Sequence, residues 1–284
     1  MIAPAAVPVS GSPLLALSWM DLAFSSALVL VAMGISAWQR LGLVRGFAIG
    51  AVRATVQLVA IGYVLAFLIS TRRWYLVLLT LLVMLIAATI TATDRQKRGR
   101  AGLFVISGIG MLVGAGLTLA YIDAVVLRLQ PWYDPQYLIP LFGMIIGNSM
   151  NAAALAAERL NSEMELRRGE VESYLALGAS PSRASAEPVR RALVASMLPT
   201  LNMLMVVGLV SLPGMMTGQV IAGSSPLTAV RYQIVVVFML AGAVAVTSVI
   251  VALWYRGTFF TAAEQLVARV PPHRAPQSPA KAGA

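Results

Sequence analysis

The chain has 284 residues, of which 59% are hydrophobic and 11% are charged, and its mean hydropathy is +0.82. Soluble domains carry about 25% charged residues, so this composition excludes an ordinary soluble protein and indicates a membrane protein. The net charge of +10 does not predict a nucleic acid partner, because the basic residues mostly flank apolar runs. The absence of cysteine excludes disulfides and thiolate metal sites.

Seven apolar segments are long enough to cross a bilayer, given that about 20 helical residues span the hydrocarbon. The sequence therefore predicts an all-α, polytopic membrane protein with about seven transmembrane helices. Their expected limits in chain order are Met20–Trp38, Phe47–Ser70, Trp74–Thr93, Ala101–Leu129, Gln136–Ala157, Ala192–Pro213 and Val230–Tyr255.

Lys and Arg gather in alternate loops, with Arg72 and Arg73 as exceptions. Because basic loops stay in the cytoplasm, the pattern predicts N-out, C-in topology. Residues 1–19 would be an extracytoplasmic segment, residues 20–257 the membrane domain and residues 258–284 a cytoplasmic tail. The Pro- and Ala-rich end of that tail predicts disorder, and its His273 is not expected to bind metal.

The longest inner loop, about residues 158–191, reads as two helices joined by a turn. Pairs such as Glu163 with Arg167 and Glu165 with Arg168 support an exposed continuation of the fifth span. Leu160, Met164, Val171 and Leu175 form an apolar stripe along that continuation.

Local signals mark where the two helices of this loop meet. Gly178 is a plausible helix terminator, Ser180 resembles an N-cap, and Pro181 fits the first helical position. An amphipathic helix that cannot cross the membrane can dock into a groove on another protein. A solvated connection without a partner is the alternative interpretation.

The loop resembles the coupling loop of ABC transporter permeases, in which Glu is followed six residues later by Gly. Glu172 and Gly178 fit this spacing, and "LGASPSR" continues it, although Ser and Tyr replace the two usual small residues. The segments "FGMIIGNSMNAAALAAERL", "LVSLPGMMTGQVIAGSSPLTAVRYQ" and "RATVQLVAIGYVL" closely resemble the FetB-type permease family.

That resemblance implies the membrane subunit of a bacterial inner-membrane exporter associated with iron export and metal resistance, with plant relatives associated with aluminium tolerance. It also implies a FetA-like ATPase partner, a homodimer of permease subunits, and coupling through Glu172, Gly178, Ser180, Pro181 and Arg183. No P-loop motif surrounds Lys97 or Lys281, so no cofactor is expected on this chain, and ATP with magnesium would bind the partner.

Polar groups at membrane depth are the candidates for a translocation pathway, because they are costly to insert. Arg53 and Gln57 lie one turn apart in the second span, where Arg53 either extends toward the interface or lines a cavity. The other candidates are Asn148, Ser149, Asn151, Asn202, Met215 and Met216. The amides serve helix packing or ion coordination, the methionines serve packing or soft-metal binding, and no metal ligand set is identified.

Three choices stay open at this stage. The Gly/Pro-rich segment 214–226 is either a re-entrant gate or an outer loop. An ion-coupled secondary transporter or channel is the alternative function, although the spans hold few of the carboxylates that ion coupling requires. A purely structural membrane protein is the reading that would remain without an ATPase, whereas an intramembrane enzyme lacks the expected His or paired Asp.

Overall fold

The computed structural model describes residues 18–94 and 100–267. Within these ranges the protein is a polytopic helical membrane protein without a β-strand, as predicted. The N-terminal segment, the basic residues Arg95, Lys97 and Arg98, and the end of the tail with His273 lie outside the described residues.

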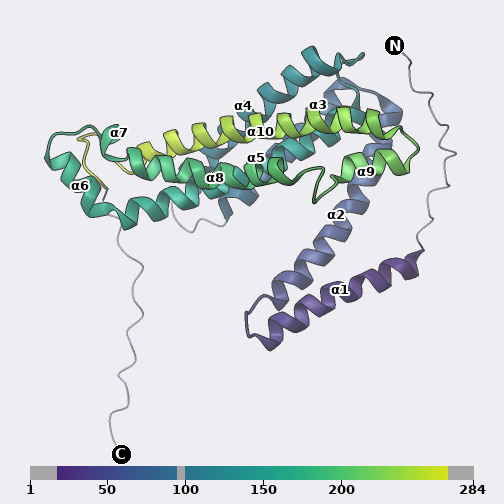
Figure 1. The fold of residues 1–284 in the computed structure, drawn as a ribbon, viewed down its shortest axis with the longest axis horizontal. Helices are drawn as coiled ribbons and strands as arrows, with labels where there is room; N and C mark the ends of the chain where they lie inside the picture. Colours follow the sequence, from purple (N-terminus) through teal and green to yellow (C-terminus); the bar gives the residue numbers. More distant parts are fainter. Residues whose placement is uncertain (1–17, 95–99, 268–284) are drawn as a thin grey trace, which may run out of the picture.

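Five long helices form the bundle. They are α3 (Trp74–Asp94), α4 (Arg100–Tyr121), α5 (Pro135–Leu166), α8 (Ala186–Val206) and α10 (Pro226–Gly257). The bundle is built around α5 and α10, because α5 packs on α3, α4 and α8, and α10 packs on α4, α5 and α8 (Figure 1). The π-helix η1 (Ile122–Leu127) extends α4.

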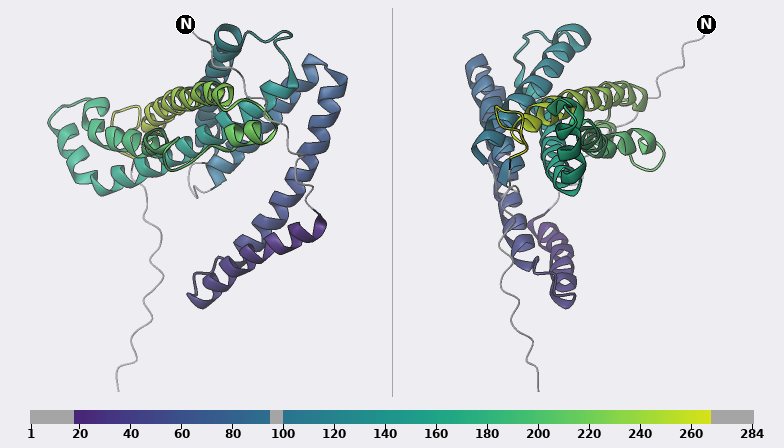
Figure 2. Two further views of the ribbon diagram at one scale, coloured as in Figure 1. Left: turned by 45° about the vertical axis from the view of Figure 1, so that its right-hand side comes forward. Right: turned by 90° about the vertical axis from the view of Figure 1, so that its left-hand side faces the viewer.

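The first two helices stand apart from the bundle. Helix α1 (Trp19–Trp38) and helix α2 (Val44–Thr71) form a hairpin, and only the far end of α2 reaches the other helices (Figure 2). Leu68, near that end, is the only residue of α2 that is fully buried in the described structure. We call residues 19–58, which project from the bundle, the α1–α2 arm.

Several helices begin where local sequence signals place them. The Asp134 carboxylate accepts a bond of 3.0 Å from the Gln136 N–H, and Pro135 follows at the first helical position. Ser225 caps the Thr228 N–H at 3.3 Å, followed by Pro226. These caps satisfy backbone donors that a helix start would otherwise leave without partners.

Two close helix contacts depend on glycine. A methyl group on Gly110 would lie 2.9 Å from Val251 Cγ2, and one on Gly114 would overlap Thr247 Oγ1. The Thr247 hydroxyl donates a hydrogen bond of 3.3 Å to the Gly110 carbonyl. Helices α4 and α10 therefore approach each other at a small-residue seam, as membrane helices commonly do.

The prediction of seven spans needs correction at the sixth. Among the described residues, five helices are long and apolar enough to cross a membrane, and α1 adds a shorter apolar stretch, Ala23–Trp38. The five are α2, α3, α4 with η1, α5 and α10. Helix α8 is not in that set; it begins before Ala192 and ends at Val206 instead of Pro213. The reason is a tight turn, in which Gly208 has a φ of +85° and donates to the Ser211 carbonyl at 2.9 Å.

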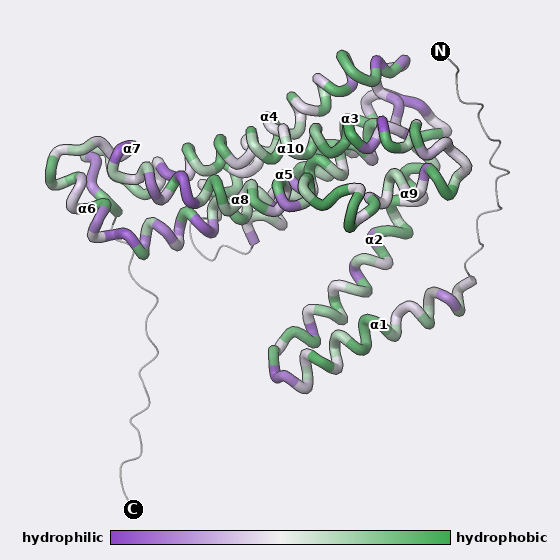
Figure 3. Tube along the Cα trace, viewed as in Figure 1, coloured by the Kyte–Doolittle hydropathy of each residue, from purple (hydrophilic) through white to green (hydrophobic). Residues whose placement is uncertain are grey.

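The Gly/Pro-rich segment after that turn forms a short helix, α9 (Gly214–Ile221), which packs against α10. It lies at the opposite end of the bundle from α6 (Arg168–Ala176) and α7 (Pro181–Ala184) (Figure 1). Hydrophilic residues gather over α6, α7 and the adjoining turns of α5 and α8 (Figure 3). This end of the bundle is therefore the polar one.

Candidate functional site

The polar end of the bundle is built as the loop pattern predicts. Helix α5 continues to Leu166, and Gly178 follows the end of α6 with a φ of +84°. The Ala179 N–H bonds the Tyr174 carbonyl at 3.0 Å, and the Gly178 N–H bonds the Leu175 carbonyl at 2.9 Å. This left-handed ending satisfies carbonyls at the end of α6, so the prediction that Gly178 terminates the helix is confirmed.

Helix α7 starts with Ser180 at the N-cap position and Pro181 inside the first turn, as predicted. The Ser180 side chain does not cap the backbone; its hydroxyl lies 3.0 Å from the Ser182 hydroxyl. Arg183 is exposed on this helix, and Glu172 and Gly178 are exposed on and just after α6. The five proposed coupling residues thus share one solvent-facing helical turn region, which we call the coupling hairpin (residues 168–185).

Ion pairs link charged side chains at the end of α5 and along α6, where the chain enters the coupling hairpin. The expected Glu163–Arg167 pair forms, at 3.2 Å. The prediction of a Glu165–Arg168 pair is wrong, because Arg168 Nε bonds Glu172 at 2.8 Å instead. The apolar stripe of Leu160, Met164 and Val171 is buried, and Leu175 packs against it.

Glu163 lies at the centre of a charge network that sequence reasoning had treated only as a helix-surface pair. Its side chain is 2% exposed and lies 3.0 Å from Arg159, 3.2 Å from Arg167 and 3.9 Å from Arg191. The spacing to Arg159 and Arg167 is readable in the sequence, whereas the contact to Arg191 comes from α8 and depends on packing. Glu163 thereby links the end of α5 to the start of α8.

Glu187 forms the exposed side of the same network. It accepts hydrogen bonds from Arg190 and Arg191 at 2.9 and 2.8 Å, and these bonds lower the pKa of its carboxyl to about 2. The bond to Glu187 also raises the pKa of Arg190. Glu187 therefore stays ionised at neutral pH, and the start of α8 carries one negative and two positive side chains.

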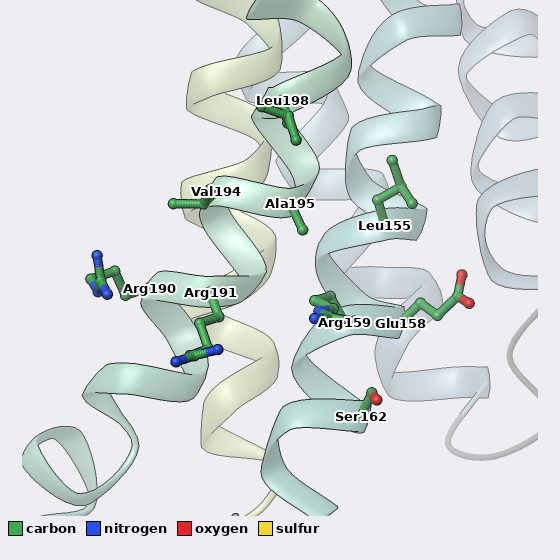
Figure 4. A pocket seen from close by; sticks show the side chains of 9 residues that line it. All are labelled: Leu155, Glu158, Arg159, Ser162, Arg190, Arg191, Val194, Ala195 and Leu198. Atoms are coloured by element: carbon green, nitrogen blue, oxygen red, sulfur yellow. The ribbon is translucent and has the colours of Figure 1, made fainter. Parts of the chain in front are cut away.

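A groove of about 650 Å³ runs between α5 and α8 beside this network (Figure 4). Arg159, Arg190 and Arg191 line its polar end. Leu155, Val194 and Leu198 line its apolar end. We call this feature the α5–α8 groove.

Two of the pathway candidates continue the walls of that groove. Asn151 precedes Leu155 by one helical turn on α5, and Asn202 follows Leu198 by one turn on α8, so each shares a face with a groove-lining residue. Both amides are exposed in the single chain. Because α5 packs on α8, Asn151 and Asn202 each lie one turn from a residue that lines the same groove, which the sequence order could not show.

The remaining candidates of the fifth span turn elsewhere. The Asn148 amide donates to the Met144 carbonyl of its own helix at 2.9 Å. Ser149 is fully buried, and its hydroxyl has no hydrogen-bond partner in the described part of the chain. Ser149 therefore faces the bundle interior, whereas Asn148, two helical turns before Leu155, is half-buried and bonds its own helix.

Arg53 and Gln57 lie together on the α1–α2 arm, far from the groove residues. They share a shallow groove of about 480 Å³ with Ile49, Val52 and Val56, and both side chains are exposed. The ion pairs found among the described residues do not include Arg53.

Met215 and Met216 are half-buried on α9, where Met215 packs against the core. Asn202 is on a different helix and does not share their element. Among the described residues, no three His, Asp or Glu side chains gather as a metal-ligand group. The predicted site residues therefore lie in separate places: the coupling hairpin, the α5–α8 face with Asn151 and Asn202, the α1–α2 arm, the α9 methionines, and Asn148 and Ser149 on α5.

Comparison with known proteins covers nearly the whole described chain. Residues 19–260 match the model of "Uncharacterised protein family (UPF0014)". The chain is 39% identical to the "UPF0014 membrane protein STAR2" of rice, over 85% of this chain and 84% of that protein. It is 37% identical to "Protein ALUMINUM SENSITIVE 3" of Arabidopsis thaliana, over 85% and 87% respectively.

A bacterial relative carries a functional name. The chain is 37% identical to the "Probable iron export permease protein FetB" of Escherichia coli, over 87% of this chain and 94% of that protein. No solved structure gives a significant match. The chain therefore belongs to the family described as Uncharacterised protein family (UPF0014), and its resemblance to FetB-type permeases is confirmed.

Proposed function

We propose that this chain is the membrane-spanning permease subunit of an ABC exporter that moves iron or another metal out of the cytoplasm. The observation that carries the proposal is the similarity to the protein named as a probable iron export permease, which extends over 94% of that protein. The coupling hairpin supports it, since it is a polar helical element at the end of an otherwise apolar bundle.

The coupling hairpin has the surface of a docking element. Two large hydrophobic side chains of the hairpin are exposed, Leu177 to 85% and Tyr174 to about half. Both lie outside the long apolar helices of the bundle. Arg183 is exposed on the adjoining helix. An apolar anchor beside a charged residue suits insertion into a groove of a partner, so this hairpin would receive the motion of a FetA-like ATPase that binds ATP and magnesium.

The orientation follows from the same assignment. If the coupling hairpin meets an ATPase, it faces the cytoplasm, and α9 faces the outside of the bacterial inner membrane. The chain would then be N-out and C-in, in agreement with the distribution of basic residues. The exposed α1–α2 arm supports assembly with a second permease subunit, since a homodimer would cover a hairpin that the single chain leaves bare.

The experiment is a reconstitution of the full-length chain with its ATPase in liposomes. We expect ATP turnover and ATP-dependent accumulation of ferrous iron, measured against a panel of other divalent metals. Metal movement at the same rate without the ATPase would overturn the proposal and favour an ion-coupled secondary transporter or channel.

A docking variant tests the coupling hairpin separately. Arg183→Glu reverses a charge on α7 and should reduce ATPase co-purification, whereas Arg45→Glu reverses the charge of another exposed arginine, on α2, and should not. Equal co-purification of both variants would place the docking surface elsewhere. The amount of each variant in the membrane provides the control for folding.

A further inference from the structure

The α5–α8 groove changes from basic to apolar along its length. Arg159, Arg190 and Arg191 line the end near the coupling hairpin, whereas Leu155, Val194 and Leu198 line the end toward the middle of the bundle (Figure 4). A ligand that fills such a groove carries an anionic head and an apolar body. The groove is large enough, at about 650 Å³, for a phosphate head with part of an acyl chain.

The arginines retain hydrogen-bond donors for an anion. The side chains of Arg190, Arg159 and Arg191 are 71%, 51% and 46% exposed, whereas the carboxylate of Glu163 beneath them is 2% exposed. Arg191 uses Nε for Glu187, and within the described residues its two terminal nitrogens remain for a ligand. Of the compensating carboxylates, Glu163 is buried, whereas Glu187, which pairs with Arg190 and Arg191, is 33% exposed but does not line the groove. The lining itself holds three arginines and one acidic residue.

Glu158 is the one acidic residue that lines the groove. Its side chain extends away from Arg190 and Arg191 in the close view (Figure 4). An anion held by these two arginines therefore stays apart from the Glu158 carboxylate.

The length of α5 and the positions of the charged residues indicate where the membrane surface is expected to lie. Helix α5 has 32 residues and is about 48 Å long, so one end projects beyond the roughly 30 Å of hydrocarbon. Its charged residues start at Glu158, and those of α8 end at Arg191. The phosphate layer of a bilayer is expected at this boundary.

We propose that the α5–α8 groove binds one anionic phospholipid, with its phosphate against Arg190 and Arg191 and an acyl chain along Leu155, Val194 and Leu198. Basic pockets between membrane helices are suited to anionic head groups. A free phosphate would leave the apolar wall uncovered, so the polarity of the groove favours the lipid. This site does not depend on the direction or the cargo of transport.

Native mass spectrometry of the purified full-length chain tests the site. The protein is titrated with phosphatidylglycerol or with phosphatidylcholine of the same acyl chains. We expect preferential retention of phosphatidylglycerol, weakened about fivefold by Arg190→Gln, because a basic residue near an anionic surface contributes about 1 kcal/mol. Glu187 keeps Arg191 as a partner in this variant, so the network at the start of α8 remains.

Two further variants separate the lipid from other occupants. Ala195→Phe fills the apolar part of the groove without a charge change and should also weaken phosphatidylglycerol binding, whereas Arg45→Gln on the α1–α2 arm should leave it unchanged. Equal binding of both lipids, or unchanged binding in both groove variants, would overturn the proposal. Equal competition by glycerol phosphate would reassign the groove to a free phosphate. Disulfide-linked dimers of Ala195→Cys would reassign it to a second copy of the chain.

Discussion

Glu163→Gln is the sharpest test of the network that joins α5 to α8. The substitution keeps the shape of the side chain and removes a charge that is 2% exposed and lies near Arg159, Arg167 and Arg191. Removing one partner of a fully buried ion pair costs about 3–5 kcal/mol. Here the arginines reach water, and Arg167 keeps Glu170 at 3.0 Å, so we expect a loss of about 1–2 kcal/mol in the free energy of unfolding.

The matched control is Glu172→Gln. It removes the same charge from a side chain that is half-exposed and pairs with Arg168 at 2.8 Å on the coupling hairpin. Exposed pairs contribute about 0–1 kcal/mol, so the control should shift stability less than Glu163→Gln does. Unfolding of the purified chain in mixed micelles, followed by circular dichroism, measures both variants. Equal losses would refute the view that Glu163 is a buried link between helices.

The other predictions concern separate parts of the chain. Gly114→Ala should destabilise the bundle by about 1–3 kcal/mol in the same unfolding assay, because its methyl group meets Thr247, whereas Gly116→Ala, with open space around it, should be neutral. The pKa of Glu187 lies near 2 and below its ordinary value of 4.5, so its stabilisation is complete above about pH 4.5 and is lost as the pH falls toward 2. The difference in melting temperature between the native chain and Glu187→Gln should therefore shrink across that range, and a constant difference would contradict the ion pairs. Arg53→Met should insert at least as well as the native chain, since a central arginine costs about 2.5–3.5 kcal/mol, but should lose transport in liposomes, and retained transport would show that Arg53 only extends to the interface.

The helix stop at Gly178 was predicted, whereas the caps at Asp134 and Ser225 are local signals that the expected span limits, Gln136 and Val230, did not use. Asp134 with Pro135, Ser225 with Pro226, and Gly178 each act on a backbone group within a few residues. Such interactions do not depend on the rest of the fold, so the sequence contains all the information needed. The end of the sixth span was wrong because apolar residues continue past Val206 while the backbone turns at Gly208. Hydropathy follows side chains and does not report that turn.

Contacts between helices were predictable only as possibilities. The sequence holds several glycine pairs at the same spacing, yet Gly110 and Gly114 pack tightly against α10, whereas Gly214 and Gly218 meet no neighbouring atoms. The link from Glu163 to Arg191 and the shared face of Asn151 and Asn202 likewise depend on how α5 packs on α8. Spacing along one helix fixes a face, but only tertiary packing selects the partner of that face.

The α1–α2 arm carries two polar side chains, Arg53 and Gln57, on a helix that the rest of the described chain leaves almost bare. Apolar side chains on an exposed helix are satisfied by lipid, but Arg53 and Gln57 are not, because acyl chains offer no hydrogen-bond partner. Both residues lie within α2, in a span whose most apolar stretch is only 6% buried. Arg53 either extends to the interface, or it meets a water-filled pathway or a second subunit, which would place protein on the bare side of α2. In the second case the transporting unit would contain more protein than the single chain, as the proposed homodimer does.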